Sequence, residues 1–195
     1  MDPVNWQQRY QNHDTPWDKG RCHPMTAKAC QFFLPGDIFV PGCGRGWDAR
    51  ELRDQSTTAN VIGLDLSANA IADARKIHGL DRLTWYEDDL FRNDDDARFA
   101  QVRNIWEHTC HCALPPSMRS DYVKRIATIL HNGGMLCGVF FTHMDDQENG
   151  PPWNTSLEEI RSLYEPWFDI VSMERVTESF AGREGEESFI VMRRR

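Results

Sequence analysis

The sequence predicts an α/β fold: a mainly parallel, seven-stranded sheet with helices on both faces and an antiparallel hairpin at the C-terminal end. Two observations predict the sheet. From Asp37 onward, short apolar runs alternate with amphipathic stretches, and this β-α-β-α rhythm is typical of parallel strands joined by crossover helices. The hairpin is predicted because a polar, glycine-containing turn separates the last two apolar runs. The expected strands are DIFVPG, VIGLDLS, LTWYEDDLF, VRNIWEHTC, MLCGVFF, FDIVSMERV and ESFIVMRRR.

Four stretches between the apolar runs are expected to form helices: WDARELRD, ANAIADARKIHG, PSMRSDYVKRIATILHNGG and LEEIRSLYEPWF. In the third, apolar residues recur at helical spacing, and Asn132, Gly133 and Gly134 mark the end of the helix. The fourth follows Ser156, a favourable N-cap residue, and Glu159 three positions later predicts a capping box.

The chain is expected to be a single domain over residues 1–195. This length suffices for one well-buried core and is too short for two ordinary domains. Residues 1–35 are polar and aromatic with three prolines. They are therefore expected to form a helical or irregular lid over a core that spans residues 36–195.

Composition and charge exclude several classes of protein. With 40% hydrophobic and 27% charged residues, the chain has the composition of a globular protein. The net charge of -8 and the pI near 5.3 argue against nucleic-acid binding, which depends on cationic side chains. The three closing arginines are interpreted as a solvated tail.

We expect no membrane association and a cytoplasmic location. No apolar run reaches the roughly 20 residues that span a bilayer, and the N-terminal stretch lacks the pattern of a secretion signal. Without such a signal, the six cysteines are expected to be reduced thiols. These are Cys22, Cys30, Cys43, Cys110, Cys112 and Cys137.

The glycine-rich stretch after the first strand, FVPGCGRGWD, predicts a ligand site. Gly42, Gly44 and Gly46 can adopt backbone angles closed to other residues, so the chain can bend and bring its amides against a ligand. Asp65 follows at the end of the next strand, about 20 residues on, where a carboxylate can accept both hydroxyls of a ribose. The two features together indicate a cofactor that contains adenosine.

The pattern fits neither of the common phosphate-binding loops. It lacks the third glycine of a dinucleotide fingerprint and the Lys-Ser/Thr pair of a nucleoside-triphosphate loop. The third strand ends in EDDLF, where Asp89 and the backbone around Leu90 can reach the adenine edge. S-adenosylmethionine suits this set because it has no pyrophosphate, and NAD is the alternative.

Taken with these motifs, the sequence resembles the thiopurine, thiol and halide S-methyltransferases, a family of class I S-adenosylmethionine-dependent enzymes with a Rossmann-like fold. The resemblance rests on FVPGCGRGWD, GLDLS, EDDLF, CALPP followed by an arginine and Tyr-Val, and NGPP. It extends to Trp6, Tyr10 and TPWDKG with His23-Pro24, and so covers nearly the whole chain. Tyr10 stands where the family often has tryptophan, and Thr142 with His143 stands where some relatives carry an aromatic residue.

The resemblance implies which residues bind the cofactor. Three aromatic side chains would close over it, and a sulfonium over an aromatic face gains about 0.5–2 kcal/mol. The glycines would hold the methionine part, and acids at the strand ends the ribose and the adenine. The expected cofactor residues are Trp6, Tyr10, Trp17, Gly42, Gly44, Asp65, Leu66, Asp89, Leu90 and Glu107.

The stretch EHTCHC places two histidines and two cysteines close together but does not predict a metal site. In a strand, His108, Cys110 and Cys112 would lie on one face and His111 on the other, so the four could not converge on one ion. The cysteines are interpreted as small buried residues. His108, His143 and Asp18 remain candidate bases for the acceptor proton, and a packed or hydrogen-bonding role is the alternative for His108.

The leading hypothesis is transfer of a methyl group from S-adenosylmethionine to a small thiol or another soft nucleophile by a monomer. Well-oriented reactants gain roughly 7–11 kcal/mol from positioning, and a free thiol is partly ionised at neutral pH. One alternative is an N- or O-methyltransferase of a small heterocyclic metabolite. Others are a cofactor-binding protein without catalysis and an NAD-linked oxidoreductase.

Overall fold

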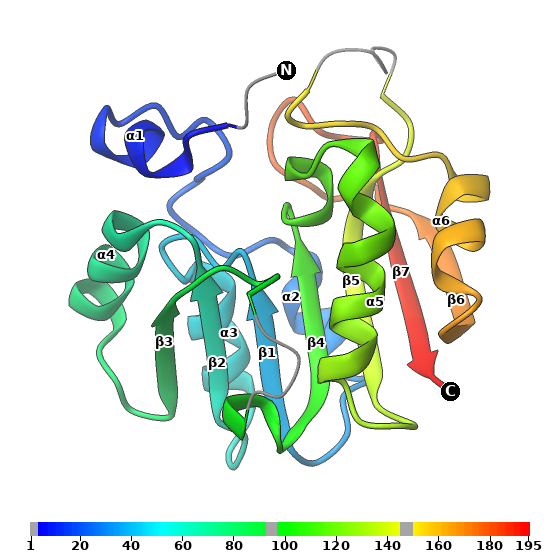
Figure 1. The fold of residues 1–195 in the computed structure, drawn as a ribbon, viewed down its shortest axis with the longest axis horizontal. Coiled ribbons are helices and arrows are strands. Elements are labelled where there is room, and N and C mark those ends of the chain that lie inside the picture. Colours follow the sequence, from blue (N-terminus) through cyan, green and yellow to red (C-terminus); the bar gives the residue numbers. More distant parts are fainter. Residues whose placement is uncertain (1–3, 93–96, 145–149) are drawn as a thin grey trace.

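Seven strands form one mixed sheet in the order β3-β2-β1-β4-β5-β7-β6 (Figure 1). The computed structural model describes residues 4–92, 97–144 and 150–195. Neighbouring strands from β3 to β5 are parallel, and β7 runs antiparallel to both β5 and β6. This confirms the mainly parallel sheet and the C-terminal hairpin. The strands are β1 (Asp37–Pro41), β2 (Val61–Asp65), β3 (Leu83–Glu87), β4 (Val102–His108), β5 (Met135–Phe141), β6 (Phe168–Arg175) and β7 (Glu187–Arg194).

Helices cover both faces of the sheet. Buried residues of α5 and α6 pack on one face, and those of α2, α3 and α4 pack on the other. The helices are α1 (Trp6–Gln11), α2 (Met25–Ala29), α3 (Trp47–Gln55), α4 (Ala68–His78), α5 (Arg119–Ile129) and α6 (Leu157–Tyr164). Three short 3-10 turns are η1 (Ala97–Phe99), η2 (His111–Ala113) and η3 (Pro116–Met118).

The central strands are buried on both sides, which explains why their sequences are almost continuously apolar. Along β1, Phe39 belongs to the core under α5, whereas Ile38 and Val40 belong to the core under α3. Along β4, Ile105 and Trp106 divide in the same way. Successive side chains of a strand point to opposite faces. The end of β4 therefore sends Glu107 and His108 to different sides.

The expected lid, residues 1–35, has two structural parts. In Figure 1, α1 lies above the upper ends of the parallel strands, beside the start of α4. In contrast, α2 packs on the sheet face beside α3, with Ala29 fully buried in that core. The part around α1 therefore has the position of a lid, and the part around α2 does not.

The capping box predicted at α6 forms only in part. The Ser156 hydroxyl accepts a hydrogen bond from the backbone N–H of Glu159 at 3.1 Å, which confirms the N-cap. The Glu159 carboxylate does not complete the box, because it accepts a hydrogen bond at 2.7 Å from the buried guanidinium of Arg119. A charge-assisted bond to a buried cation outweighs a reciprocal bond to a backbone N–H. That interaction joins α5 to α6.

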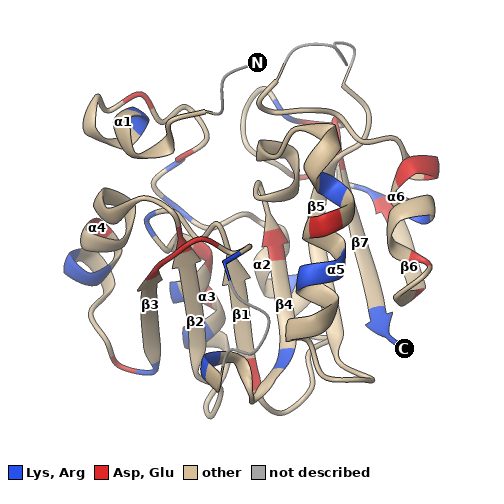
Figure 2. Cartoon of the chain, viewed as in Figure 1, with Lys and Arg blue, Asp and Glu red and all other residues tan. Residues whose placement is uncertain are grey.

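Charged residues gather on the outer helices, in loops and at strand ends, and the C-terminal end of β7 is basic (Figure 2). Among the described residues, no helix combines the length and the apolar character needed to cross a membrane. Residues 145–149 of the polar loop before α6, which include Asn149 of the NGPP motif, lie outside the described residues.

Substitution of Gly138 in β5 tests how tightly the core is packed on the α5 side of the sheet. A Cβ at this position would lie 2.7 Å from a ring carbon of Phe140 and 2.8 Å from Cβ of Glu107. We expect Gly138→Ala to lower the free energy of unfolding by about 3 kcal/mol, because the core has no room for the methyl group. Gly20→Ala is the control: its φ is +67° and no atom lies within 4 Å of a Cβ built there, so only backbone strain of about 1–2 kcal/mol applies. Equal losses in urea unfolding would contradict this account.

Candidate active site

The loops that follow the parallel strands enclose a cavity of about 390 Å³. Ligands of open α/β sheets bind at this edge, beyond the carboxyl ends of the strands. We call this space the larger cavity. A smaller cavity of about 60 Å³ adjoins it at the glycine loop. Of the predicted cofactor residues, the following line the larger cavity: Trp6, Tyr10, Trp17, Gly42, Asp65, Leu66, Asp89 and Leu90.

The glycine loop adopts the backbone that its residues predict. Gly42, Gly44 and Gly46 have φ values of +58°, +54° and +79°, in the left-handed region. A Cβ on Gly42 would lie 3.0 Å from the Cys110 sulfur, and a Cβ on Gly44 would lie 2.8 Å from the Tyr10 hydroxyl oxygen. The left-handed backbone and the nearby atoms of Cys110 and Tyr10 therefore both favour glycine at positions 42 and 44. Gly44 lines the smaller cavity.

The Asp65 carboxylate joins the loops that follow β1 and β2. One oxygen accepts a hydrogen bond from the Gly44 N–H at 2.9 Å, and the other accepts one from the Ser67 N–H at 2.8 Å. Asp65 is 8% exposed. Burial raises the pKa of its carboxyl group, and the N–H donors act against that rise. Beside it, Leu66 is 56% exposed although it is apolar, which gives an adenosine ligand a surface to cover.

The three aromatic residues of the predicted lid form one cluster. The Trp17 indole N–H donates a hydrogen bond to the Tyr10 hydroxyl at 3.2 Å. The ring centroids of Trp6 and Trp17 lie 5.3 Å apart, edge to face. The guanidinium of Arg9 lies 4.4 Å from the Trp17 centroid. The cluster lines the larger cavity from the side opposite the strand ends.

Polar contacts attach this lid to the core. The Gln7 amide group accepts a hydrogen bond from the Ser67 hydroxyl at 2.8 Å and donates one to Asn69 at 2.6 Å. Asp18 is paired with the Arg45 guanidinium at 2.5 Å, and it accepts a further bond from the Trp47 indole at 3.0 Å. Asp18 thus connects the lid to the glycine loop, and its role as a base remains a prediction.

Glu107 faces the core under α5 and lines neither cavity. It is fully buried and accepts hydrogen bonds from the backbone N–H groups of Cys110 and His111 at 2.9 and 3.0 Å. Tyr122 donates its hydroxyl hydrogen to the other carboxylate oxygen. Burial raises the pKa of Glu107 to about 7. Its side chain fixes the turn after β4, so a direct cofactor contact is not supported.

The stretch after His108 does not continue as a strand, so the alternation argument used for EHTCHC fails there. Thr109 has a φ of +66°, and the η2 turn follows from His111. The N–H groups bound by Glu107 hold this bend. His111 is buried with Nδ1 3.0 Å from the Tyr164 hydroxyl, and burial lowers its pKa to about 3. Cys112 is buried and lines the larger cavity.

The two candidate histidine bases lie apart from the larger cavity. His108 lines the smaller cavity, and its Nδ1 lies 2.6 Å from a carboxylate oxygen of Asp48. His143 is half-buried with Nε2 3.3 Å from the Ser188 hydroxyl, and it lines neither cavity. The smaller cavity is therefore lined by two of the candidate bases, His108 and Asp18, whereas His143 lies apart from them.

Several cavity residues escaped the sequence analysis. Arg183, in the loop between β6 and β7, is the most informative of them, because its Nη1 is buried without a hydrogen-bond partner among the described residues. No motif marked it: a single arginine in a polar turn reads as solvent-exposed. The lining also includes Pro151 and Pro152 of the NGPP motif and Leu114 of the CALPP motif, together with Phe141, Met144 and Cys110, none of which the sequence assigned to the site.

Comparison with known proteins identifies the family. The family model for thiopurine S-methyltransferase matches residues 1–194. The chain belongs to the thiopurine S-methyltransferase family. It is 29% identical over 189 residues to thiocyanate methyltransferase 1 of Brassica oleracea, covering 93% of this chain and 81% of that protein. It is 24% identical over 196 residues to thiopurine S-methyltransferase of Shewanella frigidimarina, covering 90% and 87%.

Solved structures agree in fold. The N-methyltransferase NodS of Bradyrhizobium japonicum, crystallised with S-adenosylhomocysteine, superposes with a TM-score of 0.74 at 15% identity, covering 98% of this chain and 99% of that chain. A methyltransferase of Anabaena variabilis gives 0.75 at 18% identity, covering 97% and 93%. These findings confirm the predicted resemblance, the methyltransferase activity and the class I, Rossmann-like fold of S-adenosylmethionine-dependent enzymes.

Asp65 gives the first test of this site. We expect Asp65→Asn to weaken S-adenosylhomocysteine binding about 10–100-fold, because a charged acceptor is replaced by a neutral amide. Titration calorimetry between pH 5 and 8 measures it. Burial raises the pKa of Asp65, so wild-type affinity should fall as the pH drops toward that pKa. Asp65→Asn should lose this part of the pH dependence, and Asp169→Asn on exposed β6 is the charge-matched control. Equal affinities of wild type and Asp65→Asn would contradict the assignment.

Proposed function

We propose that this enzyme transfers a methyl group from S-adenosylmethionine to a small, soft acceptor that reacts as an anion, such as a thiolate or thiocyanate. The observation that carries the choice of acceptor is Arg183, whose side chain is 11% exposed and whose Nη1 is buried at the larger cavity, among mostly apolar lining residues and Glu186. The names of the thiol, thiocyanate and thiopurine methyltransferases that resemble the chain support the same class of acceptor.

The residues of the larger cavity fit the cofactor. Its volume of about 390 Å³ lies in the range of small-molecule sites. At Gly42 and Gly44 a Cβ would collide with Cys110 and Tyr10, so glycine lets these side chains pack against a loop that lines both cavities. Asp65 offers carboxylate lone pairs to ribose hydroxyls, Leu66 and Leu90 offer apolar surface to the adenine, and the aromatic lid suits a sulfonium. When bound, the cofactor supplies an activated methyl group on positively charged sulfur.

The acceptor end of the larger cavity favours a polarizable group. Its lining is made of aromatic, proline and sulfur-containing side chains, including Phe141, Met144, Cys110 and Cys112. Burial raises the pKa of Cys112 to about 12 and that of Cys110 well above its ordinary value, so both are neutral thiols. Sulfur and aromatic groups interact well with soft ligands.

Arg183 provides the charge that an anionic acceptor needs. Its guanidinium lies 5.2 Å from the Phe141 ring centroid and 5.5 Å from that of Phe180, so two aromatic faces hold it in place. The nearest carboxylate is that of Glu187, with an oxygen 3.6 Å from Nη1, which is too long for a hydrogen bond. Nη1 therefore retains donor capacity for a second anion.

The protein contributes positioning and the exclusion of water. The lid aromatics cover the larger cavity, Asp65 and the glycine loop set the position of the donor, and Arg183 attracts and orients the acceptor. Orientation of this kind accounts for much of the acceleration in bimolecular displacements. An acceptor that arrives as an anion needs no base, so the proposal assigns no proton transfer to His108, His143 or Asp18.

The proposal also places the enzyme in the cytoplasm as a monomer acting on a small molecule. All six cysteines are free thiols, which suits a reducing compartment. Apolar residues of the edge hairpin pack on both cores, Phe168, Ile190 and Met192 under α6 and Phe189 and Val191 on the opposite face, whereas Val171 is exposed.

A panel of acceptors tests the function. Small thiols, thiocyanate and iodide are compared with heterocyclic amines and phenols, with S-adenosylhomocysteine release as the measurement. We expect turnover of the soft acceptors, and kcat/KM for each thiol should rise with pH in step with ionisation of that thiol. Inert thiols with reactive amines or phenols would favour an N- or O-methyltransferase. Cofactor binding without turnover of any acceptor would indicate a binding protein.

Replacement of Arg183 tests the acceptor site separately. We expect Arg183→Met to lower kcat/KM for an anionic acceptor about 10–100-fold, as the loss of a hydrogen bond to a charged group predicts. Affinity for S-adenosylhomocysteine should remain within about twofold, because Arg183 is proposed to act at the acceptor end. Arg183→Lys, which keeps the charge, is the matched control and should retain most of the rate. Unchanged kcat/KM in Arg183→Met would refute the role of this residue.

A further inference from the structure

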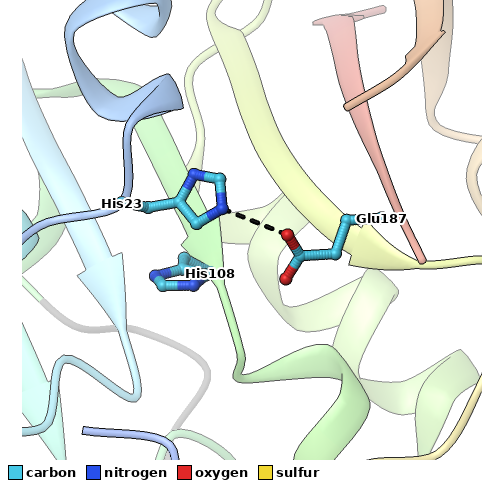
Figure 3. A group of neighbouring side chains, drawn as sticks. All are labelled: His23, His108 and Glu187. Carbon is cyan, nitrogen blue, oxygen red and sulfur yellow. Dashed lines mark hydrogen bonds and ion pairs between the residues drawn. The ribbon is translucent and has the colours of Figure 1, made fainter. Parts of the chain in front are cut away.

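A cluster of possible metal ligands lies behind the smaller cavity. His23 comes from the loop before α2, His108 from the end of β4 and Glu187 from the start of β7 (Figure 3). One ligand atom from each of the three residues lies within 4.8 Å of the other two. Two imidazoles and one carboxylate form a donor set that binds Zn²⁺ and related divalent ions.

The surroundings of His108 prepare it for a metal ion. Asp48 accepts a hydrogen bond from Nδ1 at 2.6 Å, so the proton of the neutral imidazole is on Nδ1 and Nε2 carries a lone pair. That Nε2 is buried and has no hydrogen-bond partner among the described residues. The His108 side chain is only 10% exposed. A carboxylate that holds the far nitrogen of a metal-binding histidine is a recurrent arrangement in metal sites.

Asp48 is itself held in one orientation by four donors. One oxygen accepts hydrogen bonds from the His23 backbone N–H at 2.8 Å and the Thr26 hydroxyl at 3.2 Å. The other accepts from the Trp106 indole at 3.0 Å and from His108. These four bonds hold the Asp48 carboxylate in a fixed position.

Glu187 contributes the negative ligand. Its side chain is 1% exposed. One oxygen lies 3.2 Å from His23 Nε2 and also accepts a hydrogen bond from the Ser179 hydroxyl. The other, Oε1, is buried without a hydrogen-bond partner among the described residues. Among the described residues, the cluster thus contains two buried atoms without a hydrogen bond, Nε2 of His108 and Oε1 of Glu187, and Oε1 also lies 3.6 Å from the Arg183 guanidinium.

We propose that His23, His108 and Glu187 bind one divalent transition-metal ion, with Zn²⁺ as the expected occupant and Asp48 as the positioning residue of His108. Zn²⁺ bonds of about 2.0–2.1 Å in a tetrahedron place ligand atoms about 3.4 Å apart. The contact between His23 and Glu187, at 3.2 Å, already has this spacing. The ligand atom of His108 lies within 4.8 Å of the other two, so it would have to approach them by up to about 1.4 Å.

The ion would face two neutral imidazoles and two carboxylates, Asp48 and Glu187, and the Arg183 guanidinium lies 3.6 Å from Oε1 of Glu187. The ion and Arg183 together then carry one positive charge more than the two carboxylates. The Met25 backbone N–H donates to His23 Nδ1 at 3.1 Å, so in the metal-free protein the proton of a neutral His23 is on Nε2. Metal binding at Nε2 moves that proton to Nδ1 and opens this one hydrogen bond. A fourth position can be filled by a water molecule.

Metal binding to the untagged, EDTA-treated full chain tests the proposal. We expect about one Zn²⁺ per chain by elemental analysis after equilibration with the ion. At a free Zn²⁺ concentration about 100 times the dissociation constant, Tm should rise by about 5–10 °C. His108→Ala and Glu187→Gln should abolish both effects, and Asp48→Asn should weaken affinity about 10–100-fold. His131→Ala, an exposed histidine outside the cluster, is the control and should behave as wild type.

A spectroscopic measurement on the wild type separates this site from the cysteines and does not depend on the variants folding. The Co²⁺-loaded protein should show visible bands of a site with nitrogen and oxygen ligands and no sulfur-to-metal charge transfer. X-ray absorption of the Zn²⁺ form should likewise detect only light ligand atoms. Thiolate bands, a sulfur shell, or uptake that persists in His108→Ala would overturn the proposal, as would the absence of binding. None of these results depends on the choice of methyl acceptor.

Discussion

The Asp65 carboxylate is the interaction on which the site depends most directly. By accepting the backbone N–H groups of Gly44 and Ser67, it fixes the loop after β1 relative to the loop after β2. The lid is then built on the same two loops: the Tyr10 hydroxyl packs against Gly44, and Gln7 is bonded to the Ser67 side chain. The buried Asp65 carboxylate therefore orders both the glycine loop and the segment after β2 to which the lid is attached.

The end of β4 supplies the second constraint, because adjacent residues there face opposite sides of the sheet. Glu107 turns toward α5, where it binds two N–H groups and bends the chain away from strand geometry. His108 turns toward α3, where Asp48 holds it. The bend sends Cys110 and Cys112 into the larger cavity. Glu107, which was expected at the cofactor, thus shapes the wall of the larger cavity without lining it.

The antiparallel hairpin brings the remaining charges to this edge. β7 lies beside β5, and the loop before it carries Arg183 into the cavity while Glu187 enters the strand. The two side chains are close enough for an ion pair but not for a hydrogen bond, at 3.6 Å. Each therefore keeps capacity for a further partner: an anion for Arg183 and a cation for Glu187. The proposed anionic acceptor depends on Arg183, and the proposed metal site depends on Glu187.

The sequence by itself determined the sheet, its hairpin and the glycine loop, because these depend on local periodicity and on backbone angles that only glycine adopts easily. Eight of the ten residues expected at the cofactor line the larger cavity, and their role there stays a prediction. The sequence also contained enough motifs to indicate the family. It misplaced Glu107, overextended the strand through EHTCHC and missed Arg183. Only the tertiary structure decided these points, and it alone brought His23, His108 and Glu187 together. Burial and hydrogen-bond partners depend on segments far apart in the chain, and a local pattern does not encode which distant groups will meet.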